Sequence, residues 1–256
     1  MQMKIMRYGA SSSPSPKCAF DNAAAIFLDW DGCVMIGNTL IPAARTLLER
    51  HADRVVILSN NSTHLPEDFT RILNQANVHI PPDRIILAGA EAVRLAMQDQ
   101  PARTLLLGTT RIKAYARQMG LTLVRDEPDQ ILLTRDTRFT YAKLCRAANA
   151  LQRGAKLIVA NIDATHPGPD GHIVPETGAM LAALLACVPT APMVTVGKPG
   201  PLLFARACEV AGVAAHDAVM IGDNPETDGK GATDYGIYPI LIGPDAGLTL
   251  DDIVNW

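Results

Sequence analysis

Short apolar runs alternate with stretches of helical periodicity along this chain. The run from Ala23 to Leu28 holds only apolar and small residues and is too short for a helix, so it predicts a buried strand. From Pro42 to Arg50 the apolar residues recur at helical spacing, which predicts a helix. Repeated strand–helix units are typical of a parallel sheet in an α/β fold. Further strands are expected at 55–58, 85–87, 104–107, 131–133, 156–160, 194–196, 218–221 and 238–242, and further helices at 66–75, 90–97, 112–119, 141–151, 179–187, 201–211 and from about 227.

Prolines mark two junctions between sets of these units. Pro101 follows the first set, and Pro189 and Pro192 precede its resumption. The run from Ser11 to Pro16 has the composition of a loose segment. The expected organisation is a flexible tail at 1–19, a discontinuous core at 20–100 and 191–256, and a small α/β insert at 101–190.

Composition excludes several classes of function. The 256 residues are 48% hydrophobic, enough for a sizeable core, and their formal net charge of -3 gives no basic surface for nucleic acid. No apolar run approaches the roughly 18 residues of a membrane helix, so we expect no membrane partner. An odd number of scattered cysteines argues against a disulfide framework and indicates a reduced, cytoplasmic protein. The cysteines are Cys18, Cys33, Cys145, Cys187 and Cys208.

Polar side chains follow the expected core strands at the points where they end. Asp29 and Asp31 come directly after the first strand. In an open parallel sheet the carboxyl ends of the strands share one edge, where ligands bind. Two carboxylates this close repel each other, so we expect a cation between them, and Mg²⁺ suits oxygen ligands. The other strand-end groups are Ser59 and Asn60, Lys198, and Asp223 with Asp228.

Together these groups are what a phosphoryl group needs. Phosphoryl transfer depends mostly on positioning and on neutralising the charge of the oxygens. A carboxylate can also act as the nucleophile and form an aspartyl-phosphate.

In this order the segments resemble the four motifs of the haloacid dehalogenase superfamily, which are DxDG, a Ser/Thr, a Lys, and GD followed by acids. Residues 59–63, 196–199 and 222–228 are similar to its class IIA branch of 4-nitrophenyl, sugar and nucleotide phosphatases. In the insert, residues 139–141 and 161–179 are similar to the α/β cap of that branch. The resemblance implies a Rossmann-like, doubly wound parallel sheet as the core, with an inserted α/β cap domain.

The resemblance also implies roles for single residues. Asp29 would be the nucleophile and a Mg²⁺ ligand, and Asp31 the general acid and base, with its backbone carbonyl on the metal. Asp223 would complete the metal site, supported from behind by Asn224 and Asp228. Phosphate binding would fall to Ser59, Asn60, Lys198 and Gly32, and substrate contact in the cap to Asn161 and Asp163.

Three positions depart from the family pattern. Trp30, between the two aspartates, is bulkier than usual and is expected to pack beside the nucleophile. Arg135 and Ile162 replace residues common in the cap, which weakens any transfer of a specific substrate. Cys33 is expected to be a small packing residue near the site, and His166 an exposed loop residue.

We therefore expect an enzyme that hydrolyses phosphate monoesters of small metabolites with Mg²⁺ through an aspartyl-phosphate. A phosphotransferase or mutase would use the same groups, so the sequence leaves that alternative open, and a non-catalytic phosphate-binding protein is a further one. The second aspartate and the metal ligands count against a dehalogenase. The natural substrate stays undefined, and a homodimer is possible.

Overall fold

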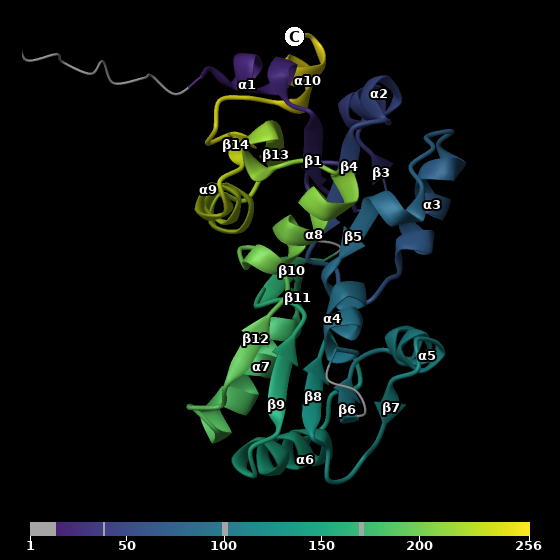
Figure 1. Cartoon of the computed structure of the whole chain (residues 1–256), viewed down its shortest axis with the longest axis vertical. Helices are drawn as coiled ribbons and strands as arrows, with labels where there is room; N and C mark the ends of the chain where they lie inside the picture. The colour runs from purple at the N-terminus through teal and green to yellow at the C-terminus, as the bar shows by residue number, and fades with distance from the viewer. Residues whose placement is uncertain (1–13, 38, 99–101, 169–171) are drawn as a thin grey trace, which may run out of the picture.

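The strands of this chain form two separate parallel sheets of five strands each, at opposite ends of an elongated molecule (Figure 1). The computed structural model describes residues 14–37, 39–98, 102–168 and 172–256. The first sheet has the order β14-β13-β1-β4-β5, with all neighbours parallel. Its strands are β1 (Ala25–Asp29), β4 (Val55–Ser59), β5 (Ile85–Leu87), β13 (Ala218–Gly222) and β14 (Tyr238–Leu241).

Helices cover both faces of the first sheet, as expected for a doubly wound fold. Along β1, Ile26 and Leu28 pack into one apolar cluster, and Ala25 and Phe27 pack into another on the opposite face. A strand buried on both faces reads as a continuous apolar run, which explains its sequence. The first cluster is covered by α1 (Pro16–Asn22), α2 (Pro42–His51), α3 (Pro66–Gln75) and α10 (Leu250–Val254), and the second by α4 (Ala88–Ala96), α8 (Pro201–Ala211) and α9 (Lys230–Tyr235).

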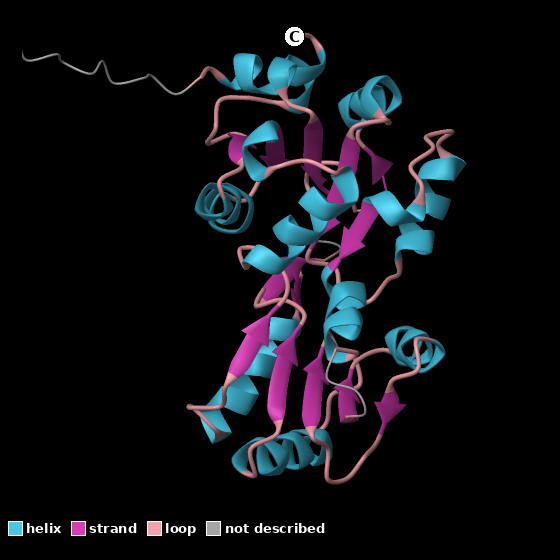
Figure 2. Cartoon of the chain, in the orientation of Figure 1, coloured by secondary structure: helices cyan, strands magenta, loops and turns pink. Residues whose placement is uncertain are grey.

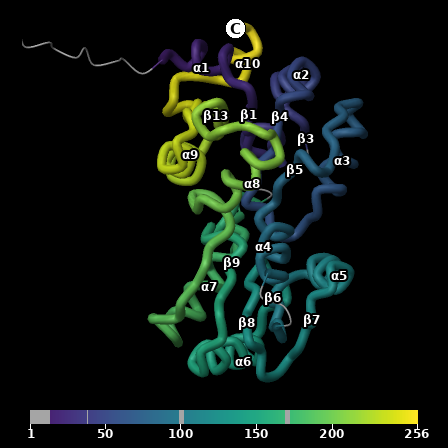
Figure 3. Tube along the Cα trace, viewed as in Figure 1, coloured from purple at the N-terminus to yellow at the C-terminus, as the bar shows by residue number. Residues whose placement is uncertain are grey.

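The order of the strands changes direction at β1. The chain moves from β1 to β4 and β5 on one side, and returns later as β13 and β14 on the other side. The colours of Figure 3 follow this course, since the chain leaves the first sheet, builds the second and then comes back. The crevice at such a switch point, outside the carboxyl ends of the strands, is where ligands bind in open α/β sheets.

The second sheet, with the order β12-β9-β8-β6-β7, is also parallel throughout. Two helices cover one face, and α4 with one further helix covers the other (Figure 2). Because Leu106, Leu132 and Ile158 share an apolar cluster with α4 and with the first sheet, the two sheets are joined by continuous packing. The elements are β6 (Arg103–Leu107), β7 (Thr122–Leu123), β8 (Gln130–Leu133), β9 (Lys156–Val159) and β12 (Met193–Thr195), with α5 (Thr110–Gln118) on the face of α4 and α6 (Tyr141–Gln152) and α7 (Thr177–Cys187) on the other.

One strand lies in a different sheet from the one expected. The segment predicted as a core strand at 194–196 forms β12, which pairs in parallel with β9, Val194 lying opposite Ile158. The second sheet therefore extends past the expected boundary at residue 190. An apolar strand is compatible with either sheet, and its pairing partner decides between them.

Local structure also appears where loops or tails were expected. Residues 16–19, placed in the flexible tail, belong to α1, which begins at Pro16 with the Ser15 hydroxyl oxygen accepting from the Cys18 amide at 3.3 Å. The rest of that tail up to residue 13 and the expected hinge at Pro101 lie outside the described residues. The loop expected at 163–178 contains a hairpin. The short elements are the hairpins β2 (Met35–Ile36) with β3 (Thr39–Leu40) and β10 (Thr165–Pro167) with β11 (Ile173–Pro175), and the 3₁₀ turns η1 (Pro82–Arg84) and η3 (Ala215–Asp217).

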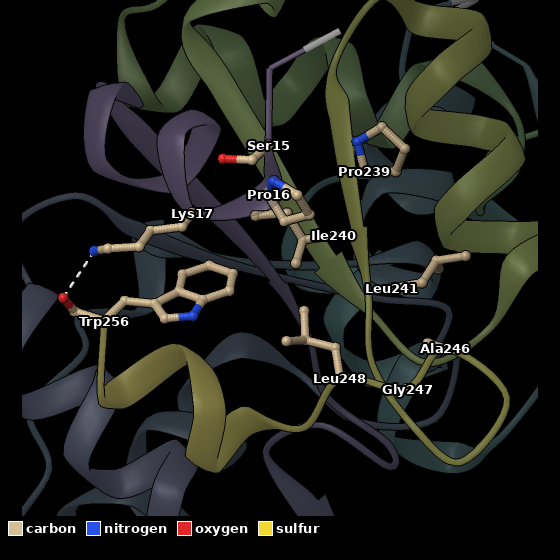
Figure 4. A pocket seen from close by; sticks show the side chains of 10 residues that line it. All are labelled: Ser15, Pro16, Lys17, Pro239, Ile240, Leu241, Ala246, Gly247, Leu248 and Trp256. Carbon is tan, nitrogen blue, oxygen red and sulfur yellow. Dashed lines mark hydrogen bonds between the residues drawn. The ribbon is translucent and has the colours of Figure 1, made fainter.

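The two ends of the described chain meet beside β14. Lys17 Nζ donates to the Trp256 carbonyl at 2.7 Å, and the Trp256 ring packs edge-on against Phe20. Figure 4 shows the pocket of about 410 Å³ that these segments enclose with β14. Lys17 is the one charged residue among those that line it, so this pocket offers no set of metal or phosphate ligands. Within the described parts of the chain, no helix is long and apolar enough to cross a membrane.

Asp68 connects a helix of the first sheet to a helix of the second. Arg111 of α5 donates to this α3 carboxylate from Nε at 2.8 Å and from Nη2 at 2.5 Å. Arg71 and the Leu65 amide donate to it as well, at 3.1 and 3.0 Å. Burial alone would raise the pKa of Asp68, but these donors together lower it below its usual value. The carboxylate is therefore stabilised in its charged form.

We predict that Arg111→Ala lowers the free energy of unfolding by about 1 kcal/mol at neutral pH, because it removes a bidentate ion pair. A carboxyl with a lowered pKa stabilises the fold above its unfolded pKa, and this contribution is lost as the pH falls through the folded value. The deficit should therefore shrink below about pH 4. Urea unfolding of both proteins across this range measures it, with Arg117→Ala, at an exposed arginine of the same helix, as the control. A deficit that does not change with pH would contradict the ion pair.

Candidate active site

Asp29 is delivered to the crevice by β1, of which it is the last residue. Its side chain is almost buried, whereas Asp31 and Gly32 are exposed. The chain turns sharply here, since the amides of Val34 and Met35 both donate to the Trp30 carbonyl, at 2.8 and 2.9 Å. After the turn, Asp31 lies close enough to Asp29 for its charge to raise the pKa of the Asp29 carboxyl.

Gly32 is required by this turn for two reasons. Its φ of +80° lies in the left-handed region that favours glycine. A Cβ at this position would also lie 2.1 Å from Asp223 Oδ2, so any side chain would displace that carboxylate. Its own amide donates to the Met35 carbonyl at 2.8 Å, so the expected contact with phosphate is not available to that amide.

Lys198 is a buried lysine that joins two aspartates from different strand ends. Its Nζ donates to Asp29 Oδ1 and to Asp228 Oδ1, each at 2.6 Å, and to the Leu58 carbonyl at 3.2 Å. Burial alone would lower the pKa of Lys198, but the carboxylates of Asp228 and Asp29 raise it above its usual value. The lysine is therefore charged at neutral pH and fixes Asp29 from one side. Lys198 follows β12, so it reaches the site from the second sheet, whereas a strand of the first sheet was expected to carry it.

Asp223 and Asp228 are placed by the end of β13 and the turn that follows. Asp223 is exposed to the crevice, and Asp228 is fully buried in the π-helical turn η4 (Pro225–Gly229). Asn224 Oδ1 accepts from the amides of Glu226 and Thr227 at 2.9 and 3.2 Å, so its side chain caps this turn. A Cβ at Gly222 would lie 2.3 Å from Asp228 Cγ, which explains the glycine before Asp223.

The carboxylates of this site carry more negative charge than Lys198 alone balances. Burial raises the pKa of Asp29 above its usual value against the opposing effect of Lys198, and the Asp228 and Asp31 carboxylates raise it further. Desolvation is also the main reason that the pKa values of Asp31 and Asp223 are raised. Lys198 balances part of this charge, and a cation between the acids would balance the rest.

The geometry fits a divalent cation. Carboxylate oxygens of Asp29 and Asp223 and the Cys33 Sγ lie within 4.8 Å of one another. Gly32 and Asp223 also line a cavity of about 530 Å³ on the side of the segment that follows β14. Oxygen ligands of this kind suit Mg²⁺ and Ca²⁺.

Ser59 ends β4 and Asn60 follows it, and their side chains differ in which hydrogen-bonding groups stay free. The buried Ser59 Oγ accepts from the Asn61 amide at 3.0 Å and keeps its own proton for another acceptor. The Asn60 side chain is fully engaged, because Oδ1 accepts from the Lys198 amide at 2.7 Å and Nδ2 donates to the Lys198 carbonyl at 3.0 Å. The expected contact of the Asn60 side chain with phosphate is therefore replaced by a structural role, which holds the Lys198 backbone.

Asn161 and Asp163 bring the second sheet to the same place. Asn161 Nδ2 donates to the Asn60 carbonyl at 2.7 Å, and Asp163 Oδ2 accepts from Asn60 Nδ2 at 3.0 Å. These two residues, expected to contact the substrate, thus tie the end of β9 to the end of β4. The exposed Ile162 lies between them.

A second cluster faces Asp31 from the insert, and the sequence did not indicate it. Arg135 Nη1 donates to Glu176 Oε1 at 2.7 Å, and His166 Nδ1 lies 2.8 Å from the same oxygen. The charges of His166 and Glu176 act on the pKa of Asp31 in opposite directions. His166 is part of this cluster and was expected to be an exposed loop residue. The three residues lie far apart along the chain, so no local pattern in the sequence indicates that they meet.

Trp30 is accommodated in the apolar core next to Asp29. The indole is buried and stacks on Phe69 of α3, with ring centroids 4.0 Å apart. Its bulk therefore packs into the core under α3, as expected.

Comparison with known proteins supports this arrangement. A family model of haloacid dehalogenase-like hydrolases matches residues 26–122, and a second model, described as HAD-hydrolase-like, matches residues 195–247. The dihydroxyacetone phosphatase of Corynebacterium glutamicum is 30% identical over 218 residues, covering 84% of this chain and 78% of that protein. The chain belongs to the haloacid dehalogenase-like hydrolases.

Solved structures of this hydrolase family have the same architecture. The 4-nitrophenylphosphatase of Thermotoga maritima is 28% identical and superposes with a TM-score of 0.82. The superposition covers 93% of this hydrolase and 98% of that chain. A glycerol phosphate phosphatase of Mycobacterium tuberculosis, solved in complex with calcium, is 27% identical and superposes with a TM-score of 0.78. The superposition covers 87% of this hydrolase and 67% of that chain. The doubly wound core with a cap domain is therefore confirmed.

Proposed function

We propose that this hydrolase is a Mg²⁺-dependent phosphatase of small phosphorylated metabolites, with Asp29 as the nucleophile. The observation that carries the proposal is the Asp29 carboxylate at the switch point of the sheet, held by Lys198 at 2.6 Å and followed two residues later by a second carboxylate in the same crevice. The family and its named relatives make the chain a phosphoric monoester hydrolase.

In the first step, the Asp29 oxygen that Lys198 does not hold attacks the phosphorus of the ester. The bond from phosphorus to the alcohol oxygen breaks as the new bond forms, and Asp31 gives its proton to the departing oxygen. In the second step, Asp31 takes a proton from water, which attacks the aspartyl-phosphate and releases inorganic phosphate. The raised pKa of Asp31 suits a group that must carry a proton and then return it.

Asp29 and Asp223, with the Asp31 backbone carbonyl, would hold the divalent cation. The cation supplies positive charge between a carboxylate and a phosphoryl group, which would otherwise repel each other by about 4 kcal/mol at 4 Å and a moderate effective dielectric. Asp228 and Asn224 would support the site without contacting the cation, because Asp228 pairs with Lys198 and Asn224 caps the turn.

The phosphoryl oxygens would be held by the Ser59 hydroxyl and the Asn60 backbone N–H, and Lys198, whose three N–H groups are occupied, would contribute its positive charge. The Asn60 backbone N–H takes this role because its side chain is occupied. The rest of the substrate would face Arg135, Glu176 and His166 in the cap. A charged, hydrogen-bonding wall of this kind fits a small polar alcohol better than a bulky apolar one.

The cysteines indicate the compartment in which the enzyme works. Every cysteine in the chain is unpaired, which fits a reducing compartment, and we propose the cytoplasm. A homodimer remains a prediction.

We predict that Asp29→Asn reduces phosphate release from 4-nitrophenyl phosphate and a panel of metabolite phosphates to background, because an amide cannot attack phosphorus at a useful rate. Circular dichroism should show an unchanged fold. Asp83→Asn makes the same change at an exposed turn and should keep full activity. Turnover by Asp29→Asn near that of the control would make the nucleophile assignment wrong.

A second prediction concerns the cation. Excess EDTA should stop turnover, and added Mg²⁺ should restore it, because without the ion the carboxylates and the phosphoryl group repel each other. Ca²⁺ should bind but restore little turnover, since it tolerates a looser ligand geometry than Mg²⁺. Phosphate release after chelation and readdition measures both effects. Full activity in EDTA would remove the metal from the mechanism.

A further inference from the structure

Asp163 is a carboxylate of the cap whose contacts lead into the core. Asn60 Nδ2 donates to Asp163 Oδ2 at 3.0 Å and lies 3.3 Å from Oδ1. In the described parts of the chain, this carboxylate accepts from no other donor and forms no ion pair. An acid without a cation beside it repels an anionic substrate, so substrate binding does not account for its presence near a phosphate site. Its contact with Asn60 offers a different reason.

The backbone of Asp163 is held in place before any substrate binds. Its amide donates to Asn161 Oδ1 at 3.2 Å, and its carbonyl accepts from the Gly178 amide at 2.8 Å. A Cβ at Gly178 would lie 2.2 Å from the Ile162 carbonyl oxygen and 2.7 Å from that of Asp163, so only glycine lets α7 approach this loop so closely. The carboxylate is therefore presented to Asn60 by a fixed piece of backbone.

A chain of hydrogen bonds connects this carboxylate to Asp29. Asn60 Nδ2 donates one proton to Asp163 and the other to the Lys198 carbonyl at 3.0 Å, while Oδ1 accepts from the Lys198 amide at 2.7 Å. With these groups engaged, the Asn60 amide has a single orientation. A Cβ at Gly197 would lie 2.6 Å from Asn60 Oδ1, which explains the glycine before the lysine. Lys198 Nζ in turn donates to Asp29 Oδ1 at 2.6 Å.

We propose that Asp163 is a positioning residue of the phosphatase reaction. By fixing the Asn60 side chain it holds the backbone of Lys198, and through this lysine it holds the Asp29 carboxylate in line for attack on phosphorus. This inference rests on the proposed function. The cap then contributes to the chemical step itself, in addition to facing the alcohol of the substrate.

The test compares two phosphate esters with different alcohols, 4-nitrophenyl phosphate and glycerol phosphate, both with Mg²⁺. Because a misplacement of about 1 Å costs up to about 100-fold in rate, Asp163→Ala should lower kcat by about 10- to 100-fold. The factor should be the same for both esters, and KM should stay within about threefold. Asp163→Asn keeps an acceptor oxygen and should recover most of the loss. Asp126→Ala removes an exposed carboxylate of the cap and should keep the wild-type kcat.

A double variant shows whether Asp163 acts through Asn60. Asn60→Ala removes the side chain and keeps the backbone N–H, so adding Asp163→Ala to it should change kcat by no more than about twofold. If Asn60→Ala does not fold by circular dichroism, Asn60→Ser takes its place. Losses that multiply in the double variant would overturn the proposal. A rise in KM that differs between the two esters would also overturn it, since a contact with the alcohol gives that result.

Hydrogen exchange gives a readout that does not need turnover. The Lys198 amide should exchange at least about tenfold faster in Asp163→Ala, because its acceptor, Asn60 Oδ1, is no longer fixed. The Val196 amide, which donates to the Val159 carbonyl at 2.9 Å, should be unchanged. Equal protection of the Lys198 amide in both proteins would contradict the positioning role. Failure of the phosphatase assignment would be seen separately, as no phosphate release by the wild-type protein from either ester.

Discussion

The ion pairs of the buried Lys198 are the interaction on which the site depends. One ammonium group holds Asp29 from the end of β1 and Asp228 from the turn after β13, each at 2.6 Å, and also donates to the carbonyl of Leu58 in β4. Three neighbouring strands of the first sheet thus meet at one nitrogen. Burying this charge would be costly without its partners, and burying either carboxylate would be costly without the lysine. Asp29, the proposed nucleophile, is therefore fixed by the same contacts that stabilise the strand ends.

Asn60 extends this constraint to the cap. Its side chain forms hydrogen bonds to both the amide and the carbonyl of Lys198, and it also donates to Asp163, while its carbonyl accepts from Asn161. The cap is thus attached where the chemistry takes place, and α4 attaches it again through apolar packing. The crevice is bounded by the carboxylates on the core side and by the cluster of Arg135, Glu176 and His166 on the cap side.

Much of the site could be predicted from the sequence because strand ends are local features. Apolar runs followed by acids located Asp29 and Asp223, and the parallel fold implied that these ends share an edge. The partner of β12 could not be predicted, because its apolar pattern suits either sheet and only pairing with β9 decides between them. The occupied side chain of Asn60 depends on contacts between distant residues, which no local pattern records.

The most direct measurement is the free energy of unfolding of Lys198→Met by urea, compared with that of Lys198→Met/Asp228→Asn. Because the single change leaves two buried carboxylates without their partner, we expect a loss of about 3–5 kcal/mol at neutral pH. The second change removes one of those charges and should recover part of the loss. A Lys198→Met variant as stable as the wild type would contradict the central role of this lysine.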